Sequence, residues 1–230
     1  MFSSDPTIAV TVNYRNALEG HVERCVQSLI EQTYENWTAY LCDDASDTEP
    51  DFPYDRRIRY RRNKLRLGSV ANTLYTLAYA ADADIVVQLD GDDMLRNHAL
   101  SVIVEHHMAG ADLTWGSSET WGFDAGIVYR AEPFKGDLWD FSAMAPRSYR
   151  MSLYRQAWEK WGWSAFADET GEPWPFVTDI AILYPLIRIA RKPTPITDVI
   201  YYTDRSGMNH DPAREDIRQA IIRKSEKLQP

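Results

Sequence analysis

Apolar runs alternate with amphipathic stretches along the first half of the chain. Short apolar runs bounded by polar residues predict strands at residues 8–14, 37–42 and 85–89, and we expect a further strand at residues 58–63. The residues between the first two runs repeat apolar positions at helical spacing, and residues 68–81 do the same. Strands and helices in alternation are typical of an α/β domain built on a parallel sheet.

A dense group of carboxylates stands where the last of these predicted strands ends. Residues 90–93 read Asp-Gly-Asp-Asp and follow the apolar run directly. Ligands of open α/β sheets bind outside the carboxyl ends of the strands. Carboxylates this close repel one another unless a cation or hydrogen-bond donors compensate, and an all-oxygen site suits Mg²⁺ or Mn²⁺. The alternative is a polar turn in which Asp92 or Asp93 caps a helix that starts at Met94.

The composition fits one globular domain. A chain of 230 residues with 44% hydrophobic content can bury a single large core, so we expect one domain over residues 1–230. No stretch approaches the ~20 apolar residues of a membrane span, and residues 1–5 lack the features of a signal peptide. We therefore expect a cytoplasmic protein without a membrane span. The net charge of −9 opposes unspecific binding to nucleic acid or to anionic membranes.

Several sequence motifs follow one another along the chain. They lie at residues 10–16, 28–37 and 43–47, at Asn63 together with residues 68–72, and at residues 90–93. In this order and at these intervals they resemble a family 2 glycosyltransferase of the GT-A fold, and the resemblance covers about residues 1–210. It implies a Rossmann-like α/β domain whose mixed central sheet is flanked by helices. We expect a nucleotide-sugar-binding half at 1–93, an acceptor half with a tail loop at 94–210, and a C-terminal helix at 211–230.

The resemblance implies a nucleoside diphosphate sugar as the donor, and we expect a UDP-sugar. The predicted donor-binding residues are Thr11, Asn13, Arg15, Asp43, Asp44, Asn63, Arg66, Asn72, Asp90 and Gly91. Successive residues of an extended chain point to opposite faces, so only one of Asp43 and Asp44 can enter the pocket directly. The resemblance favours Asp44 for the base. Asn63 and Asn72 fit equally well as residues that fix the loop and the start of the helix.

A divalent metal is the implied cofactor, either Mn²⁺ or Mg²⁺, because a cation on the donor phosphates stabilises the charge of the leaving nucleotide. We expect Asp92 to be the direct ligand and Asp90 to face the ribose or the water shell of the metal. Asp93 either assists or caps the following helix. His210 is a candidate additional ligand, with an ordinary surface histidine as the alternative. Residues 204–210 combine a glycine with polar side chains after a strand, which predicts a lid over the donor.

The resemblance also implies inversion in a single displacement, which requires a general base. Asp179 is the predicted base. It precedes an apolar stretch at 180–184 that predicts a helix, and helix N-terminal amides favour an ionised carboxylate. The alternative role is that of an N-cap, for which Thr178 is the other candidate. The fallback bases lie in the preceding loop: Asp168, Glu169 and Glu172.

The second half of the chain would carry the acceptor. Residues 146–150 resemble the segment that opens the acceptor-side helix. Seven of the eight tryptophans lie beyond position 110, which indicates a surface for a flat ligand such as a sugar. We expect a glycan or glycoconjugate acceptor.

A basic run complicates this expectation. Its members are Arg56, Arg57, Arg59, Arg61, Arg62, Lys64 and Arg66. Alternation along a strand would send Arg59 and Arg61 to one face and Arg62 to the other, so the run cannot serve one ligand as a whole. We expect a solvated sheet edge whose cations pair with acidic neighbours. The alternatives are that Lys64 or Arg66 approaches the donor pyrophosphate, or that the run attracts a polyanionic acceptor such as DNA carrying hydroxymethylated bases.

A third class of function is a protein that binds nucleotide sugars without turning them over. The carboxylates Asp90, Asp92 and Asp179 are all intact, which disfavours such a noncatalytic binder.

Overall fold

The computed structural model describes residues 5–142, 144–206 and 213–229. The described residues form one nine-stranded sheet in the order β3-β2-β1-β4-β8-β6-β9-β5, with β7 paired to β6. The strands are β1 Ile8–Tyr14, β2 Trp37–Asp43, β3 Ile58–Arg62, β4 Ile85–Asp90, β5 Met94–Leu95, β6 Leu113–Trp121, β7 Val128–Tyr129, β8 Arg147–Arg150 and β9 Pro193–Asp204. The strands predicted from the sequence are confirmed, each with ends within one residue of the prediction.

The sheet is mixed in direction. β3, β2, β1 and β4 run parallel, as expected for strands joined by helices. β8 is antiparallel to both of its neighbours, β4 and β6. The far side of the sheet continues with β9 parallel to β6 and β5 antiparallel to β9. A strand from the second half of the chain is therefore inserted beside the strand that carries the acidic turn.

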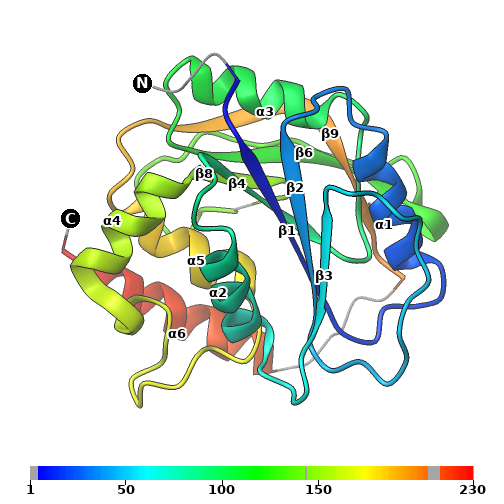
Figure 1. The fold of residues 1–230 in the computed structure, drawn as a ribbon. Helices are drawn as coiled ribbons and strands as arrows, with labels where there is room; N and C mark the ends of the chain where they lie inside the picture. Colours follow the sequence, from blue (N-terminus) through cyan, green and yellow to red (C-terminus); the bar gives the residue numbers. More distant parts are fainter. Residues whose placement is uncertain (1–4, 143, 207–212, 230) are drawn as a thin grey trace.

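Helices cover both faces of the sheet (Figure 1). They are α1 His21–Ile30, α2 Ser69–Tyr79, α3 Ala99–Met108, α4 Met151–Trp161, α5 Thr178–Ile187 and α6 Ala213–Lys227, with single turns η1 Gly122–Asp124 and η2 Gly162–Ala165. One buried apolar cluster joins α1 and α3 to one face of the sheet. A second cluster joins α2, α4, α5 and α6 to the other face. This arrangement confirms the α/β prediction of a central mixed sheet between helices.

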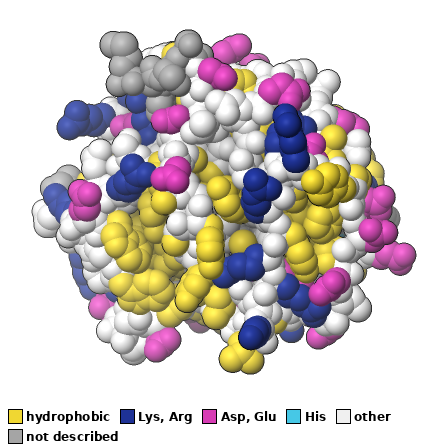
Figure 2. Space-filling model, viewed as in Figure 1, with side chains coloured by type: hydrophobic (Ala, Val, Ile, Leu, Met, Phe, Trp, Pro, Cys, Tyr) yellow, Lys and Arg dark blue, Asp and Glu magenta, His cyan; other side chains and the backbone are white. Residues whose placement is uncertain are grey.

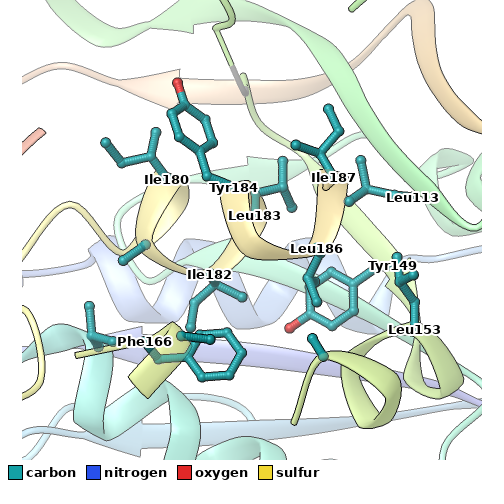
Figure 3. Close-up of a cluster of buried hydrophobic side chains, with 14 of the residues drawn as sticks. Leu113, Tyr149, Leu153, Phe166, Ile180, Ile182, Leu183, Tyr184, Leu186 and Ile187 are labelled. Carbon is teal, nitrogen blue, oxygen red and sulfur yellow. The ribbon is translucent and has the colours of Figure 1, made fainter. Parts of the chain in front are cut away.

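Helix α5 lies inside the second cluster. Its residues from Ile180 to Ile187 are all buried, so this helix is apolar around its whole circumference, as buried helices are. Figure 3 shows side chains leaving the helix on opposite sides, with Ile182 on one side and Tyr184 on the other. The Tyr184 hydroxyl donates to the Phe141 carbonyl at 2.7 Å. The start of α5, where Asp179 lies, is thus held by packing on several sides.

The capping alternative for the acidic turn is wrong. The residues after the acidic turn form the short strand β5, and α3 begins only at Ala99 with His98 at its N-cap. Asp92 and Asp93 therefore do not cap a helix from Met94. Residues 147–150, which were expected to open a helix, form strand β8 and lead directly into α4 at Met151.

The basic run lies on β3, at the edge of the sheet, and in its flanking loops. Arg57 is paired with Glu35 at 2.7 Å and with Asp55 at 2.8 Å. Arg62 is paired with Asp43 at 3.6 Å and with Glu49 at 3.4 Å.

Arg61, on the opposite face of β3, lies over the rings of Tyr75 and Tyr79 of α2. Figure 2 shows Lys and Arg side chains spread among hydrophobic and acidic ones over the visible face. These contacts confirm that the run divides between two faces.

Among the described residues, no helix is long and apolar enough to cross a bilayer.

Candidate active site

The face of the sheet that packs on α2 and α5 changes from apolar to polar toward the carboxyl ends of its central strands. Successive residues on that face are Ala9, Thr11 and Asn13 on β1, and Val86, Gln88 and Asp90 on β4. The strands are parallel and in register, with Thr11 opposite Gln88 and Asn13 opposite Asp90. Strand periodicity alone therefore brings these four polar side chains together beyond the edge of the core.

A cavity of about 240 Å³ opens at this place. Many of the predicted site residues line it: Thr11, Asn13, Arg15, Asp44, Arg66, Asn72, Asp90 and Asp179. The strand ends form its floor, the start of α2 lines one wall, and the segment from Pro175 to Asp179 before and within α5 lines another. The cavity joins residues of both predicted halves of the chain.

Other lining residues were not given a role by the sequence. The most polar are Gln88, Arg147 and Arg214, and the aromatic ones are Tyr14 and Phe176. Gln88 carries a signal that could have identified it, because it is the one polar residue inside the apolar run of β4 and shares a face with Asp90. Arg147 had no such signal, since its place depends on the pairing of β8 with β4.

The tryptophans do not line this cavity. Trp115 and Trp174 are buried in the core. Trp158 and Trp163 pack edge to face at the surface, with ring centroids 6.4 Å apart. Within the described part of the chain, the rings that face the cavity are those of Tyr14 and Phe176, so tryptophan density did not locate the site.

Asp43 and Asp44 differ in their surroundings. Asp43 is fully buried and accepts hydrogen bonds from the backbone and side chain of Ser46, and it does not line the cavity. Asp44 lines the cavity and accepts hydrogen bonds from the backbone amides of Leu67 at 2.7 Å and Gly68 at 2.9 Å. It thereby ties the loop before α2 to the strand end. Asp44 is also buried, but of the two it is the one that lines the cavity.

Asn63 and Asn72 hold the same region together. Asn63 donates to Asp44 at 3.0 Å and to Asn72 at 2.9 Å. Asn72 in turn donates to the Cys42 carbonyl at 2.9 Å. Asn72 also lines the cavity, whereas Asn63 does not. Both side chains thus fix the loop and the helix start, which was one of the two expected roles.

The acidic turn presents its carboxylates in different environments. Asp90 is exposed, with 55% of its side chain accessible, and it lines the cavity. Asp92 is half-buried, and burial together with the charge of Asp90 raises its pKa to about 6. Asp93 is buried and accepts hydrogen bonds from the Tyr201 hydroxyl and the Asp204 amide, both at 2.7 Å. Burial, then Asp90 and Asp92, raise the pKa of Asp93.

Gly91 lies between these carboxylates and packs against β1. A Cβ at this position would come within 2.6 Å of the Tyr14 Cβ, so the turn approaches the strand as closely as only glycine allows. Gly91 itself does not line the cavity. Its role in the structure is to let the acidic turn fold tightly against the end of β1.

The described residues contain no group of three or more His, Cys, Asp and Glu side chains that could hold a metal ion. Asp90 and Asp92 supply carboxylate oxygens from one turn, which is the donor chemistry that Mg²⁺ and Mn²⁺ prefer. Burial, followed by the charge of Asp90, raises the pKa of Asp92, and a cation at this turn would favour its ionised form. The chemistry of Asp90 and Asp92 fits a divalent cation whose other ligands come from phosphate and water, but of the two only Asp90 lines the cavity. His210 and most of the expected lid lie outside the described residues.

Asp179 lies in the first turn of α5, with 33% of its side chain exposed at the cavity. The N-cap of α5 is Val177, in a left-handed conformation with φ of 64°, and no side chain caps the helix. The capping alternative for Asp179 and Thr178 is therefore wrong. Asp179 thus faces the cavity from the first turn of α5 without serving as its cap.

The fallback bases lie elsewhere. Asp168 accepts hydrogen bonds from Thr170 and Glu172 within its own turn, and the hydrogen bond from the Thr170 hydroxyl is the main reason that the pKa of Asp168 is lowered. Glu169 faces Lys227 at 3.7 Å. Neither of these acids nor Glu172 lines the cavity.

Arg147 lies between Asp90 and Asp179. Its guanidinium nitrogens approach the Asp90 carboxylate at 3.7 Å and the Asp179 carboxylate at 3.8 Å. Burial opposes the charge of this guanidinium, but Asp179 and Asp90 outweigh that effect and raise the pKa of Arg147. Around the cavity, acidic and basic groups thus alternate, and a permanent cation separates the two most accessible carboxylates.

Comparison with known proteins decides the family. Residues 8–164 match the model of a family described as "Glycosyl transferase family 2". The chain belongs to this family. The resemblance seen in the sequence motifs is thereby confirmed.

Individual relatives are more distant. EpsE of Bacillus subtilis, whose name describes a glycosyltransferase, is 29% identical over 99 residues, which cover 40% of this chain and 35% of EpsE. The structure of Staphylococcus aureus TarS 1-349 has a TM-score of 0.64 at 15% identity, covering 86% of this chain and 60% of that one. The complex of TarS 1-349 with UDP gives 0.66 at 14% identity, with 95% and 65% covered. The chain thus spans well under the full length of these relatives, and the likeness to TarS establishes the GT-A fold.

Proposed function

We propose that this family 2 protein transfers a sugar from a nucleoside diphosphate sugar to an acceptor hydroxyl, with the help of Mn²⁺ or Mg²⁺. The observation that carries the proposal is that Asp90, at the end of β4, and Asp179, at the start of α5, line the same cavity. One carboxylate lies on the donor side and one on the acceptor side of the same space. Such a pair supplies the two charges that metal-assisted transfer with a general base needs.

The donor would lie along the polar face of β1 and β4. Asp44 can accept hydrogen bonds from a base or ribose, and Thr11 and Asn13 lie on the adjoining floor. Arg15 and Arg66 also face the cavity and can approach a diphosphate. TarS 1-349 was solved in complex with UDP-GlcNAc and with UDP. This supports a UDP-sugar as the donor to be tried first.

The metal would be held by Asp92 and Asp90. When bound, a divalent cation stabilises the negative charge that develops on the departing diphosphate. Asp92, less exposed than Asp90, would be the direct ligand, while Asp90 would hold water of the metal or the ribose. Asp93 is engaged with Tyr201 and the Asp204 amide, so its proposed part is to keep the turn in place.

Asp179 would take the proton from the acceptor hydroxyl as that oxygen bonds to the anomeric carbon. The base and the leaving diphosphate then lie on opposite sides of the sugar, and the configuration inverts in one displacement. The start of α5 is rigidly packed, which would keep the carboxylate in place. Proton removal by a positioned base contributes ~10²- to 10⁴-fold in rate.

We propose a glycan or glycoconjugate as the acceptor rather than DNA. Arg57 and Arg62 are engaged with acidic neighbours, and Arg61 is engaged with tyrosine rings. These contacts engage three of the seven cations of the basic run, and the net charge of −9 opposes binding of the whole chain to a phosphate backbone. Salt dependence offers a check, because affinity for a polyanion falls steeply as salt concentration rises.

The test is a panel of UDP-, GDP- and dTDP-sugars assayed for slow donor hydrolysis with Mn²⁺, which needs no acceptor. We expect one UDP-sugar to be hydrolysed, and EDTA to stop the reaction. Asp92→Ala should abolish turnover and weaken Mn²⁺-dependent nucleotide binding while the protein stays folded.

The matched control is Asp82→Ala, an exposed acid in the loop before β4, which should behave as wild type. Full activity in EDTA, or in Asp92→Ala, would contradict the metal assignment. A wild-type protein that turns over none of the donors would contradict the proposed function.

A further inference from the structure

Arg147 owes its place to the insertion of β8 in the sheet. It is the first residue of β8 and pairs with Gln88 of β4 on one side and with Trp115 of β6 on the other. Paired residues of neighbouring strands share a face, so Arg147 lies on the same face as Gln88 and Asp90. Because β8 is antiparallel to β4, its beginning lies beside the end of β4. The pairing register of β8 with β4 therefore places Arg147 at the cavity.

The guanidinium is far less accessible than its partners. Only 11% of the Arg147 side chain is exposed, compared with 55% for Asp90 and 33% for Asp179. A cation buried to this extent requires opposite charges close by. Two different terminal nitrogens of Arg147 meet the two carboxylates. All three side chains line the cavity, and the arginine is the least exposed of them.

A guanidinium is planar and its donors are fixed relative to one another, so it sets the separation of the groups that it contacts. Here the groups belong to β4 and α5, two elements that are remote in sequence. The distances of 3.7 and 3.8 Å exceed hydrogen-bond length, which leaves room for either contact to shorten when a ligand binds.

We propose that Arg147 is a positioning residue for the transfer reaction. It directs the Asp179 carboxylate toward the cavity and fixes its distance from Asp90 on the donor side. The inference rests on the proposed function and adds a residue to it. Arg147 acts through Asp179, so its removal should slow the reaction without a matching loss of donor binding.

A merely structural arginine offers the comparison. Arg150 stands at the other end of the same strand and donates to the backbone carbonyls of Ala111 at 2.9 Å and His107 at 2.7 Å. It does not line the cavity. Arg150→Met should lower the melting temperature and leave kcat unchanged, which makes it the matched control for Arg147→Met.

The first measurement is a double-mutant cycle on kcat, using the UDP-sugar that the wild type hydrolyses fastest. Arg147→Met should lower kcat by ~10²-fold or more, with KM nearly unchanged. Arg147→Lys should recover part of the rate, because lysine keeps the positive charge but lacks the planar set of fixed donors that contacts both carboxylates. Arg147→Met with Asp179→Asn should be no slower than Asp179→Asn alone, because both changes disable the same group.

The second measurement is the same cycle on melting temperature, which does not depend on activity. The loss in the double variant should be smaller than the sum of the two single losses, because removing one partner of a buried pair leaves the other uncompensated. Additive losses in kcat, a rise in KM alone, or an equal kcat loss in Arg150→Met would each overturn the positioning role. An active wild type with a fully active Arg147→Met contradicts only this inference, whereas an inactive wild type contradicts the proposed function itself.

Discussion

At the scale of single residues, the surroundings of each carboxylate decide what it can do. Asp43 and Asp93 are buried, and their oxygens already accept hydrogen bonds from neighbouring groups. Asp90 and Asp179 remain accessible at the cavity. Aspartates that look equivalent in the sequence therefore divide into those that hold the fold and those that can meet a ligand.

Asp179→Asn tests the general base most directly. The amide is nearly the same size as the carboxylate and cannot take a proton, so the fold and nucleotide affinity should be preserved. We expect transfer or donor hydrolysis to fall by ~10²- to 10⁴-fold. Single-turnover kinetics, together with calorimetric titration of UDP, would separate the chemical step from binding.

Glu169→Gln is the control for this substitution, because Glu169 stands in the upstream loop and faces Lys227 instead of the cavity. It should retain the wild-type rate. A fast Asp179→Asn combined with a slow Glu169→Gln or Asp168→Asn would move the base to the upstream loop.

His107 allows a prediction about pH and stability. It is buried, with Nδ1 donating to the Ala111 carbonyl at 3.0 Å and Nε2 beside the Ser148 hydroxyl at 2.8 Å. Burial is the main cause that lowers its pKa to about 4. The unfolded chain, with a histidine pKa near 6.5, binds a proton first as the pH falls. Folding stability should therefore decrease from about pH 6.5 down to pH 4, by on the order of 3 kcal/mol from this one residue.

Denaturant titrations at pH 7 and pH 4 would measure this effect. His107→Gln should show a smaller loss of unfolding free energy between the two pH values than the wild type does. His98→Gln, which changes an exposed histidine, should show the same loss as the wild type. Equal losses in all three proteins would mean that His107 does not set the pH dependence.

At the scale of elements, the turn between β4 and β5 depends on its tight contact with β1. Gly91→Ala would bring a methyl group to within 2.6 Å of the Tyr14 Cβ, and backbone atoms rather than a flexible side-chain end would have to move. We expect a loss of about 1 to 3 kcal/mol in unfolding free energy. The turn carries Asp90 and Asp92, so Mn²⁺-dependent nucleotide binding should weaken as well.

Thermal unfolding and nucleotide titration of Gly91→Ala would measure both effects, with the surface variant Asp82→Ala as the reference. Unchanged stability would mean that the turn can move away from β1 at little cost. Unchanged nucleotide binding would mean that the position of the turn does not govern the donor site.

At the scale of the whole molecule, local patterns predicted the parallel half of the sheet and its rim. Apolar runs gave β1, β2 and β4, and the polar residues after them gave much of the cavity lining. The strand period can be inferred from local sequence, and parallel strands joined by helices bring their carboxyl ends to one rim, which is enough to gather those residues.

The antiparallel part of the sheet and the residues that it brings to the cavity could not be predicted from local patterns. The position of β8 between β4 and β6 is a long-range pairing that no local pattern encodes. Arg147 and the connection that it makes between Asp90 and Asp179 follow from that pairing. Tryptophan density did not point to the cavity either, since no tryptophan is among the described residues that line it.

The composition of the cavity lining has a kinetic consequence. Its residues run from Thr11 to Arg214, so almost the whole chain must be in place before the cavity exists. Contacts between residues this far apart in sequence are slow to form, because a long loop of chain must close for each of them. During refolding, the ability to bind a nucleotide should therefore return late, after the secondary structure has already recovered.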